Sequence, residues 1–256
     1  MAYQENKYQK ERGISLYTVI VLVLLSTLLA LWASRTSLFN EMIVGNDADY
    51  QRAFEAAQAM VQDAELDIQR SAVDGSACIP DAGKPDQCRP LGTSLFFPYC
   101  NGTDRTEFLT LKAALNNLTA VDGRELRCSK GICKKFIETE DWWNDSTTFG
   151  LMTAANLGAR YGQFTGAKTG NGSNPILSLG STNQGAWYWV EVLDVPDNIP
   201  GLMSSASTPS FTKNTFPTVP GCPMYRITAI ALGLKPNTKA IIQSVFMPKP
   251  DSLTSR

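Results

Sequence analysis

Histidine is absent from the 256 residues of this sequence. Because histidine is the commonest general base at neutral pH and a frequent metal ligand, its absence argues against many hydrolases and most zinc sites. The sequence also lacks the G-x-S-x-G, P-loop, H-E-x-x-H and EF-hand patterns. The formal net charge is −1, so no global positive field attracts nucleic acid. We therefore expect no catalysis, no cofactor, no metal site and no nucleic-acid partner.

Two pairs of aspartates remain as candidates for a cation site: Asp47 with Asp49, and Asp194 with Asp197. Carboxylates at such spacings could bind Ca²⁺. We interpret the first pair as a helix cap and the second as loop residues, because aspartate favours both positions.

Charge, proline and glycine are all absent from residues 14–34. A helix of that length rises by about 32 Å, which matches the hydrocarbon thickness of a bilayer. A cleaved secretory signal has a shorter apolar core followed by small residues, whereas Trp32, Arg35 and Thr36 end this one. The segment is predicted to be a retained membrane helix, and a plain signal anchor is the simplest alternative.

Residues 1–13 are polar throughout and include Lys7, Lys10 and Arg12. Positive charge in front of a membrane helix keeps that end in the cytoplasm, so the rest of the chain is predicted to be exported. The abrupt change from polar to apolar residues after Gly13 resembles the end of a type IV prepilin leader, which a peptidase removes while the apolar helix is kept. We therefore expect cleavage between Gly13 and Ile14, with methylation of the new N-terminus.

A second helical pattern follows the membrane segment. Apolar residues recur at helical spacing between residues 50 and 68, while charged and amide side chains, Asp63 among them, fill much of the rest. Residues 35–70 are predicted to form an amphipathic helix that continues the first one. Gly-Asn-Asp at 45–47 is the one plausible break. A simple membrane anchor does not require an amphipathic helix after its membrane segment.

The segment S-R-T-S-L-F-N-E-M-I-V-G-N-D-A-D-Y-Q-R-A-F-E-A-A-Q-A-M-V-Q-D-A-E, residues 34–65, resembles the N-terminal signature of PilX-type minor pilins of type IV pili. The Glu-Met, Gly-Asn and Ala-Phe-Glu-Ala-Ala elements within it match especially well. Similar patches occur later, as Y-R-I-T-A, Q-S-V-F, C-S-K-G-I-C followed by a tryptophan pair, and A-R-Y-G.

The resemblance implies an α+β, type IV pilin-like fold. In this fold a long N-terminal helix, with a membrane half and an amphipathic half, packs on a small antiparallel sheet that carries large loop insertions. The expected divisions are a leader at 1–13, a membrane or filament-core helix at 14–34, an amphipathic helix at 35–70 and an exported head domain at 71–256.

The first part of the head is predicted to be poor in regular structure. Residues 104–119 form a short amphipathic helix in this interpretation. Most of 140–185 is expected to be loop, because Gly, Asn, Ser and Thr are frequent there. The segments 71–185 and 194–222 are the large insertions, and such loops often carry contacts.

Three strands are predicted in the second part of the head. Ala186–Leu193 is rich in aromatic and β-branched residues. Residues 224–232 and 238–246 flank a turn with Gly, Pro and Asn, and so form an antiparallel hairpin. Trp187 and Trp189 share one strand face, and we expect them to pack against the helix rather than to bind a sugar or a partner.

The six cysteines lie on the exported side. An even number in an oxidising compartment suggests three disulfides. Zinc binding is the alternative, and the absence of a C-x₂-C pair and of histidine disfavours it. Gly131 allows a tight turn between the closest pair. The expected pairs are Cys128 with Cys133, Cys78 with Cys88, and Cys100 with Cys222.

One residue departs from the pattern of the family. Most pilins carry glutamate at the fifth position of the mature chain, where its carboxylate offsets the ammonium of a neighbour's N-terminus in the apolar filament core. Counted from Ile14, the fifth residue here is Thr18, which cannot neutralise an ammonium. The departure favours a position with no subunit above it, as for the tip-most pseudopilin of type II secretion, GspK, to which PilX-type pilins are similar.

The resemblance thus implies a non-catalytic minor pilin that takes part in type IV pilus assembly within a tip or priming complex, with roles in cell adhesion and twitching motility. The implied partners are prepilin peptidase, other minor pilins and a tip adhesin. The implied locations are the bacterial inner membrane, with the N-terminus in the cytoplasm, and then the pilus tip. The alternatives are a type II secretion pseudopilin and a signal-anchored periplasmic hydrolase.

Overall fold

The computed structural model describes residues 14–79, 87–89, 95–98, 106–121, 123, 125–136, 141–181, 183–193 and 223–248. The chain divides into two compact units, Met1–Ala48 and Asp49–Arg256. The predicted leader, the insertion at 194–222 and the Cys100–Cys222 pair lie outside the described residues.

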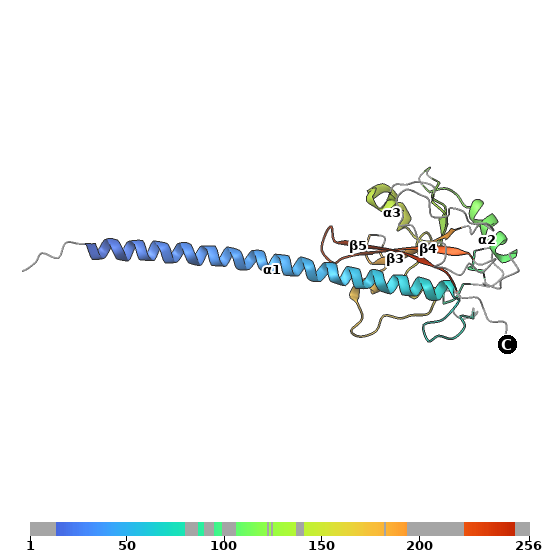
Figure 1. Cartoon of the computed structure of the whole chain (residues 1–256), viewed down its shortest axis with the longest axis horizontal. Coiled ribbons are helices and arrows are strands. Elements are labelled where there is room, and N and C mark those ends of the chain that lie inside the picture. The colour runs from blue at the N-terminus through green and yellow to red at the C-terminus, as the bar shows by residue number, and fades with distance from the viewer. Residues whose placement is uncertain are drawn as a thin grey trace, which may run out of the picture. The chain divides into compact units, whose positions relative to one another are not determined.

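Helix α1 runs without interruption over Ile14–Ile68, 55 residues in all (Figure 1). The break considered at residues 45–47 is therefore wrong. A single glycine costs a helix only about 1 kcal/mol relative to alanine, and the residues around it continue the helix. By length and composition α1 is apolar enough to cross a membrane.

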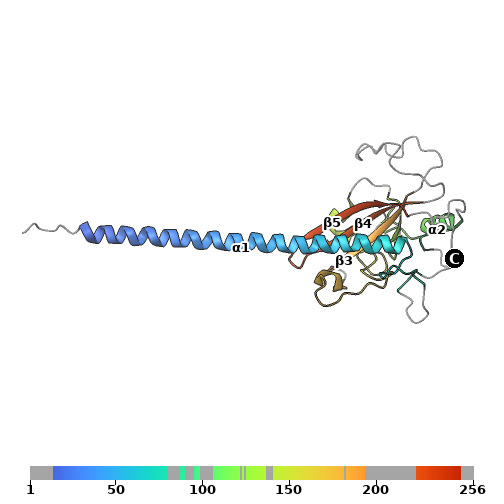
Figure 2. The ribbon, with the colours of Figure 1, turned by 60° about the horizontal axis from the view of Figure 1, so that its bottom comes forward.

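In the second unit the last part of α1 packs on a sheet (Figure 2). Four of its buried residues are alanines, which let the helix approach the strands closely, and Met60 is fully buried beside them. The helix residues in this core are Ala53, Ala56, Ala57, Met60, Ala64 and Ile68. They pack with the side chains of the strands, including Tyr188, Val190, Ile227, Ala229 and Ala231.

In the part of the head that the structure describes, the sheet has five strands in the order β1-β2-β3-β4-β5. Strand β3 pairs antiparallel with β4, and β4 with β5, so the three predicted strands are confirmed. Strand β2 pairs parallel with β3, so the sheet is mixed rather than wholly antiparallel. The strands are β1 (Cys128–Ser129), β2 (Ile132–Lys134), β3 (Ala186–Leu193), β4 (Met224–Leu232) and β5 (Lys239–Phe246).

Short helices complete the head. Helix α2 (Thr106–Asn116) confirms the helix predicted over 104–119. Part of the segment expected to be loop is helical, with the one-turn 3₁₀ helices η1 (Trp142–Asn144) and η2 (Pro175–Ser178) and helix α3 (Ser146–Met152). Local capping explains α3, because the side chain of Asp145 accepts the N–H of Thr147.

Trp187 and Trp189 are buried, as expected, but the prediction that they pack against α1 is wrong. They belong to a second core with Trp142, Met152 and Cys133, whereas their neighbour Tyr188 joins the core that contains α1. The period of a strand places the two indoles on one face but does not say which face meets the helix. Residues from α3 and η1 cover them instead: Trp142 meets Trp189 edge to face, with ring centroids 4.9 Å apart.

Candidate functional site: the exposed helix and the polar network of the head

The first unit presents an apolar helical surface. Nearly all side chains of residues 14–48 are exposed, including those of Leu22, Leu28 and Trp32 in the predicted membrane segment. An apolar surface of this extent needs a bilayer or other helices around it. Exposed apolar side chains continue past residue 34 at Leu38, Phe39, Met42, Ile43 and Val44.

Thr18 lies on this helix and bonds to its own backbone. Its hydroxyl is 2.9 Å from the carbonyl oxygen of Ser15 and 3.3 Å from that of Ile14. Such back-bonding is the usual way in which threonine satisfies its hydroxyl within a helix. The side chain remains uncharged, so it offers no counter-charge to an ammonium group. Ile14 is the first residue of α1, and Gly13 lies outside the described residues.

Two of the three expected disulfides fall in the described part of the chain, and both are present. Cys128 and Cys133 are opposite each other in the β1–β2 pair, with a Cα–Cα distance of 4.1 Å. Gly131, with φ of 81°, helps the chain turn between them. Cys78 and Cys88 form the second bond, with a Cα–Cα distance of 5.6 Å.

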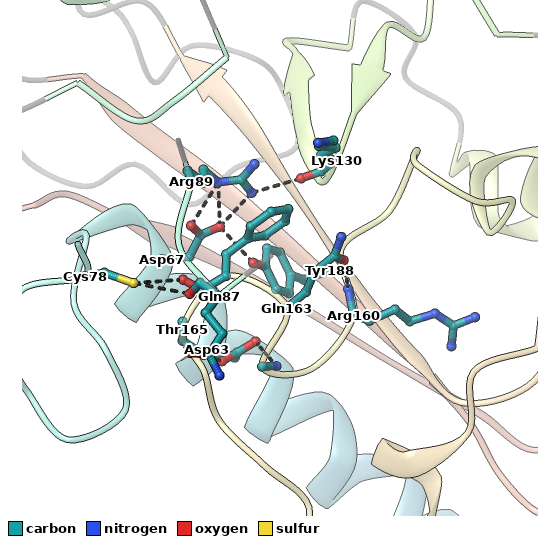
Figure 3. A network of polar contacts seen from close by, with 12 residues as sticks. Asp63, Asp67, Cys78, Gln87, Arg89, Lys130, Arg160, Gln163, Thr165 and Tyr188 are labelled. Atoms are coloured by element: carbon teal, nitrogen blue, oxygen red, sulfur yellow. Dashed lines mark hydrogen bonds and ion pairs between the residues drawn. The ribbon is translucent and has the colours of Figure 1, made fainter. Parts of the chain in front are cut away.

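A buried ion pair joins α1 to the segment that carries the second disulfide. Asp67 accepts hydrogen bonds from Nε of Arg89 at 2.9 Å and from Nη2 at 2.7 Å. The hydroxyl of Tyr188 on β3 donates to the same carboxylate at 2.7 Å (Figure 3). Burial raises the pKa of Tyr188 well above its usual value, and the charge of Asp67 raises it further. Tyr188 therefore stays protonated and remains a donor.

Arg89 reaches further elements of the head. Its Nη2 donates to the carbonyl oxygen of Lys130, at the β1–β2 turn, at 2.9 Å. Its guanidinium lies over the rings of Phe164, 3.8 Å from the centroid, and Phe97, at 5.0 Å. The planar guanidinium suits both the two-point contact with a carboxylate and stacking on aromatic rings. One side chain thus connects α1, the β1–β2 turn and two loops.

One turn before Asp67 a second carboxylate is buried, and none of the described residues forms an ion pair with it. Asp63 accepts a hydrogen bond from the hydroxyl of Thr165 and another from the N–H of Gly162 at 2.8 Å (Figure 3). Burial raises its pKa to about 6; the two hydrogen bonds oppose that shift and the nearby charge of Asp67 adds to it. The expectation that Asp63 lies on the polar face of α1 is wrong, because its side chain is directed into the head.

The interpretation of Asp49 as a helix cap is also wrong, because α1 continues through it. Its carboxylate accepts the N–H groups of Leu234 at 2.9 Å and Lys235 at 3.0 Å, in the turn between β4 and β5. It therefore caps a hairpin. Within the described ranges, no group of three or more His, Cys, Asp or Glu side chains could hold a metal ion.

Sequence reasoning missed two sets of polar contacts: the cluster of Asp63, Asp67, Arg89 and Tyr188, and the separate contact of Asp49 with the β4–β5 turn. A signal was present: the three aspartates continue the spacing of the buried alanines along α1. Their carboxylates are engaged with groups of the head itself, and this arrangement suits attachment of the head to the helix.

The fold defines the class of the protein as pilin-like: a long N-terminal helix that is apolar at its start and packs, further along, on a sheet. Comparison with family models identifies the family. The model described as type IV pilus assembly protein PilX C-term matches residues 98–248, and the PilX N-terminal model matches residues 12–62. The chain belongs to the PilX family of type IV pilus assembly proteins. Neither curated proteins nor solved structures gave a significant match.

Proposed function

We propose that the protein is a non-catalytic minor pilin that acts at the tip of the type IV pilus, within a tip or priming complex. The family supports a role in pilus assembly. The observation that carries the finer assignment is Thr18, an uncharged residue whose hydroxyl bonds to carbonyl groups of its own helix. A subunit of this kind is poorly suited to sit beneath the charged N-terminus of another subunit, because a buried ammonium without a counter-charge is costly.

The N-terminal region supports the rest of this assignment. After removal of residues 1–13 by prepilin peptidase, the mature chain begins at Ile14 with the apolar helix. The helix first holds the subunit in the inner membrane and then packs among the helices of other pilins. The further partners are other minor pilins and a tip adhesin, and the final location is the pilus tip at the cell surface.

Immunogold labelling of sheared pili with antibodies against the head tests the position directly. Label at one end of each filament is the expected result. The matched variant is Thr18→Glu, which introduces the carboxylate that most pilins carry and should allow the subunit to enter the shaft. Dense label along the shaft of wild-type pili would contradict the tip assignment.

The family match favours the pilus over a type II secretion system as the site of action. Deletion of the gene separates the two systems. Loss of surface pili with normal protein secretion is expected, whereas a secretion defect with normal pili would support the pseudopilin alternative.

A further inference from the structure

The Cys78–Cys88 disulfide and the Asp67–Arg89 ion pair belong to one closed path through the head. Figure 3 shows the ion pair, with Cys78 near it. The path begins near the end of α1, where the carbonyl oxygen of Arg70 accepts the N–H of Cys78 at 2.8 Å. The disulfide leads from Cys78 to Cys88, and Arg89 is the next residue. The side chain of Arg89 then returns to α1 at Asp67, three residues before Arg70.

The sulfur of Cys78 is also closely packed. It lies 3.3 Å from the carbonyl oxygens of Gln87 and Phe164. Because a disulfide sulfur carries no proton, these approaches are van der Waals contacts rather than hydrogen bonds. The sulfur of Cys78 therefore contacts both the segment that precedes Arg89 and the loop whose phenyl ring Arg89 covers.

Arg89 supplies a positive charge next to two buried carboxylates on the same face of α1. Asp63 and Asp67 are one turn apart and both are nearly fully buried. Among the described residues Arg89 forms the ion pair with Asp67, while Asp63 accepts hydrogen bonds only from neutral groups. If Arg89 were absent from its site, two like charges would be buried together without the cation that pairs with Asp67, which is strongly unfavourable.

The ion pair cannot be expected to order the segment of Arg89 by itself. Desolvation of two charges cancels much or all of their attraction, so a buried pair contributes little net free energy. Ordering a chain segment, in contrast, has an entropic cost for every residue. The covalent bond joins Cys88 to Cys78, which is hydrogen-bonded to Arg70 just after α1, and so it removes most of that entropic cost before the ion pair forms.

From this geometry we propose that formation of the Cys78–Cys88 disulfide is the step that allows the head to close on α1, because it places Arg89 as the counter-ion of Asp67. The exported head meets an oxidant that carries a disulfide of its own. By thiol–disulfide exchange the two cysteine thiols form the S–S bond, and their two electrons and two protons pass to the oxidant, which leaves as a dithiol. The reduced subunit keeps its aspartates outside the head, so closure is confined to the oxidising compartment.

The test uses Asp67→Asn in full-length protein in detergent micelles, unfolded by urea and followed by tryptophan fluorescence. In the wild type the substitution removes the partner of a buried arginine, so the unfolding midpoint should fall. In the C78S/C88S variant Arg89 no longer holds its site, so closure of the head on α1 would bury the charge of Asp67 without its counter-ion. The same substitution removes that penalty, so the midpoint should rise. The reversal of sign distinguishes this mechanism from simple loop closure.

The other disulfide supplies the matched control. In a C128S/C133S variant Arg89 keeps its place, so D67N should lower the midpoint as it does in the wild type. An equal fall of the midpoint in the C78S/C88S background would overturn the proposal, because it would mean that Arg89 pairs with Asp67 without the bond.

A reciprocal measurement covers the case in which C78S/C88S does not fold. If the bond favours the ion pair, the ion pair must favour the bond by the same factor. In Arg89→Met, Cys78–Cys88 should therefore be reduced by dithiothreitol more readily than in the wild type, by about fivefold or more in equilibrium constant, as read by alkylation and mass spectrometry. Cys128–Cys133 should not change. Equal susceptibility of Cys78–Cys88 in the two proteins would contradict the coupling.

Discussion

Asp49 and Lys235 are 186 positions apart, yet the carboxylate of Asp49 accepts the backbone N–H of Lys235 at 3.0 Å. The other carboxylate oxygen accepts the N–H of Leu234. A residue in the middle of a helix thereby caps the turn of the β4–β5 hairpin. The contact replaces the usual local capping of a turn with one that exists only when helix and sheet are packed.

Asp49→Ala should lower the free energy of unfolding by about 1–3 kcal/mol, because two backbone donors lose their acceptor. Urea denaturation of the full-length protein in detergent measures the change. Asp47→Ala is the matched control: it lies on the same helix with an exposed side chain, so its effect should stay within about 0.5 kcal/mol. Equal effects of the two substitutions would exclude the capping role.

The same contact has a pH dependence. Burial alone would raise the pKa of Asp49, but the hydrogen bonds from Lys235, Leu234 and Thr238 outweigh it and lower the pKa below its usual value. A lowered carboxyl pKa stabilises the folded state above the ordinary value of 3.8 and loses that contribution as the pH falls further. The difference in stability between wild type and Asp49→Ala should therefore be larger at pH 7 than at pH 3.

The contribution of Asp63 to the free energy of unfolding should change with pH in the opposite direction, and at higher pH values than that of Asp49. Burial raises its pKa to about 6, so the folded state binds this proton more tightly than the unfolded state does. Between pH 7 and pH 5 the contribution of Asp63 to stability should increase by about 1 kcal/mol. The groups near it include Thr165, Gly162, Tyr161, Tyr188 and Asp67.

Asp63→Asn should remove that increase, as measured by urea denaturation at the two pH values. Glu55→Gln, at an exposed position on the same helix, should leave it in place. If both variants kept the full pH dependence of the wild type, another group would be responsible for it.

Gly131 and Gly75 form a natural pair for testing the β1–β2 turn, since both have φ of 81°. A Cβ atom at Gly75 would meet nothing within 4 Å, whereas one at Gly131 would lie 2.6 Å from Cβ of Ala159. Gly75→Ala should cost about 1–2 kcal/mol from backbone strain alone. Gly131→Ala should cost about 2–5 kcal/mol, because crowding adds to the same strain. Thermal or urea unfolding that gives equal costs would show that the turn can move away from Ala159.

Processing of the N-terminus is predicted to occur after Gly13. Intact mass or N-terminal sequencing of protein from pilus preparations should show a chain that begins at Ile14 with a methylated amine. Gly13→Arg should leave the leader attached, because the substitution changes the residue at the cleavage junction. Gly45→Arg, which changes the other glycine near the apolar segment, should leave processing unchanged. A mature chain that starts at Met1 would contradict the pilin assignment.

Regular elements with a strong local pattern could be predicted well. The length and uniform apolarity of residues 14–34 predicted the start of α1, and β3, β4, β5 and α2 followed from their residue types and flanking turns. Strands β1 and β2 were missed, because they have two and three residues and depend on pairing with β3 rather than on their own sequence. Helix α3 was missed in a segment rich in turn residues, although Asp145 caps it.

The sequence by itself determined the features that depend on local chemistry: the apolar helix, the absence of a charge at Thr18, the family signature around residues 34–65 and the two nearest cysteine pairs. The tertiary structure alone decided the roles of the polar residues. An aspartate on a helix has the same sequence context whether it faces water or the head, and its partner can be 22 positions away, as for Asp67 and Arg89, or 121, as for Asp67 and Tyr188. These residues come into contact only when helix and sheet pack, because a buried carboxylate is stable only beside donors that the rest of the fold supplies.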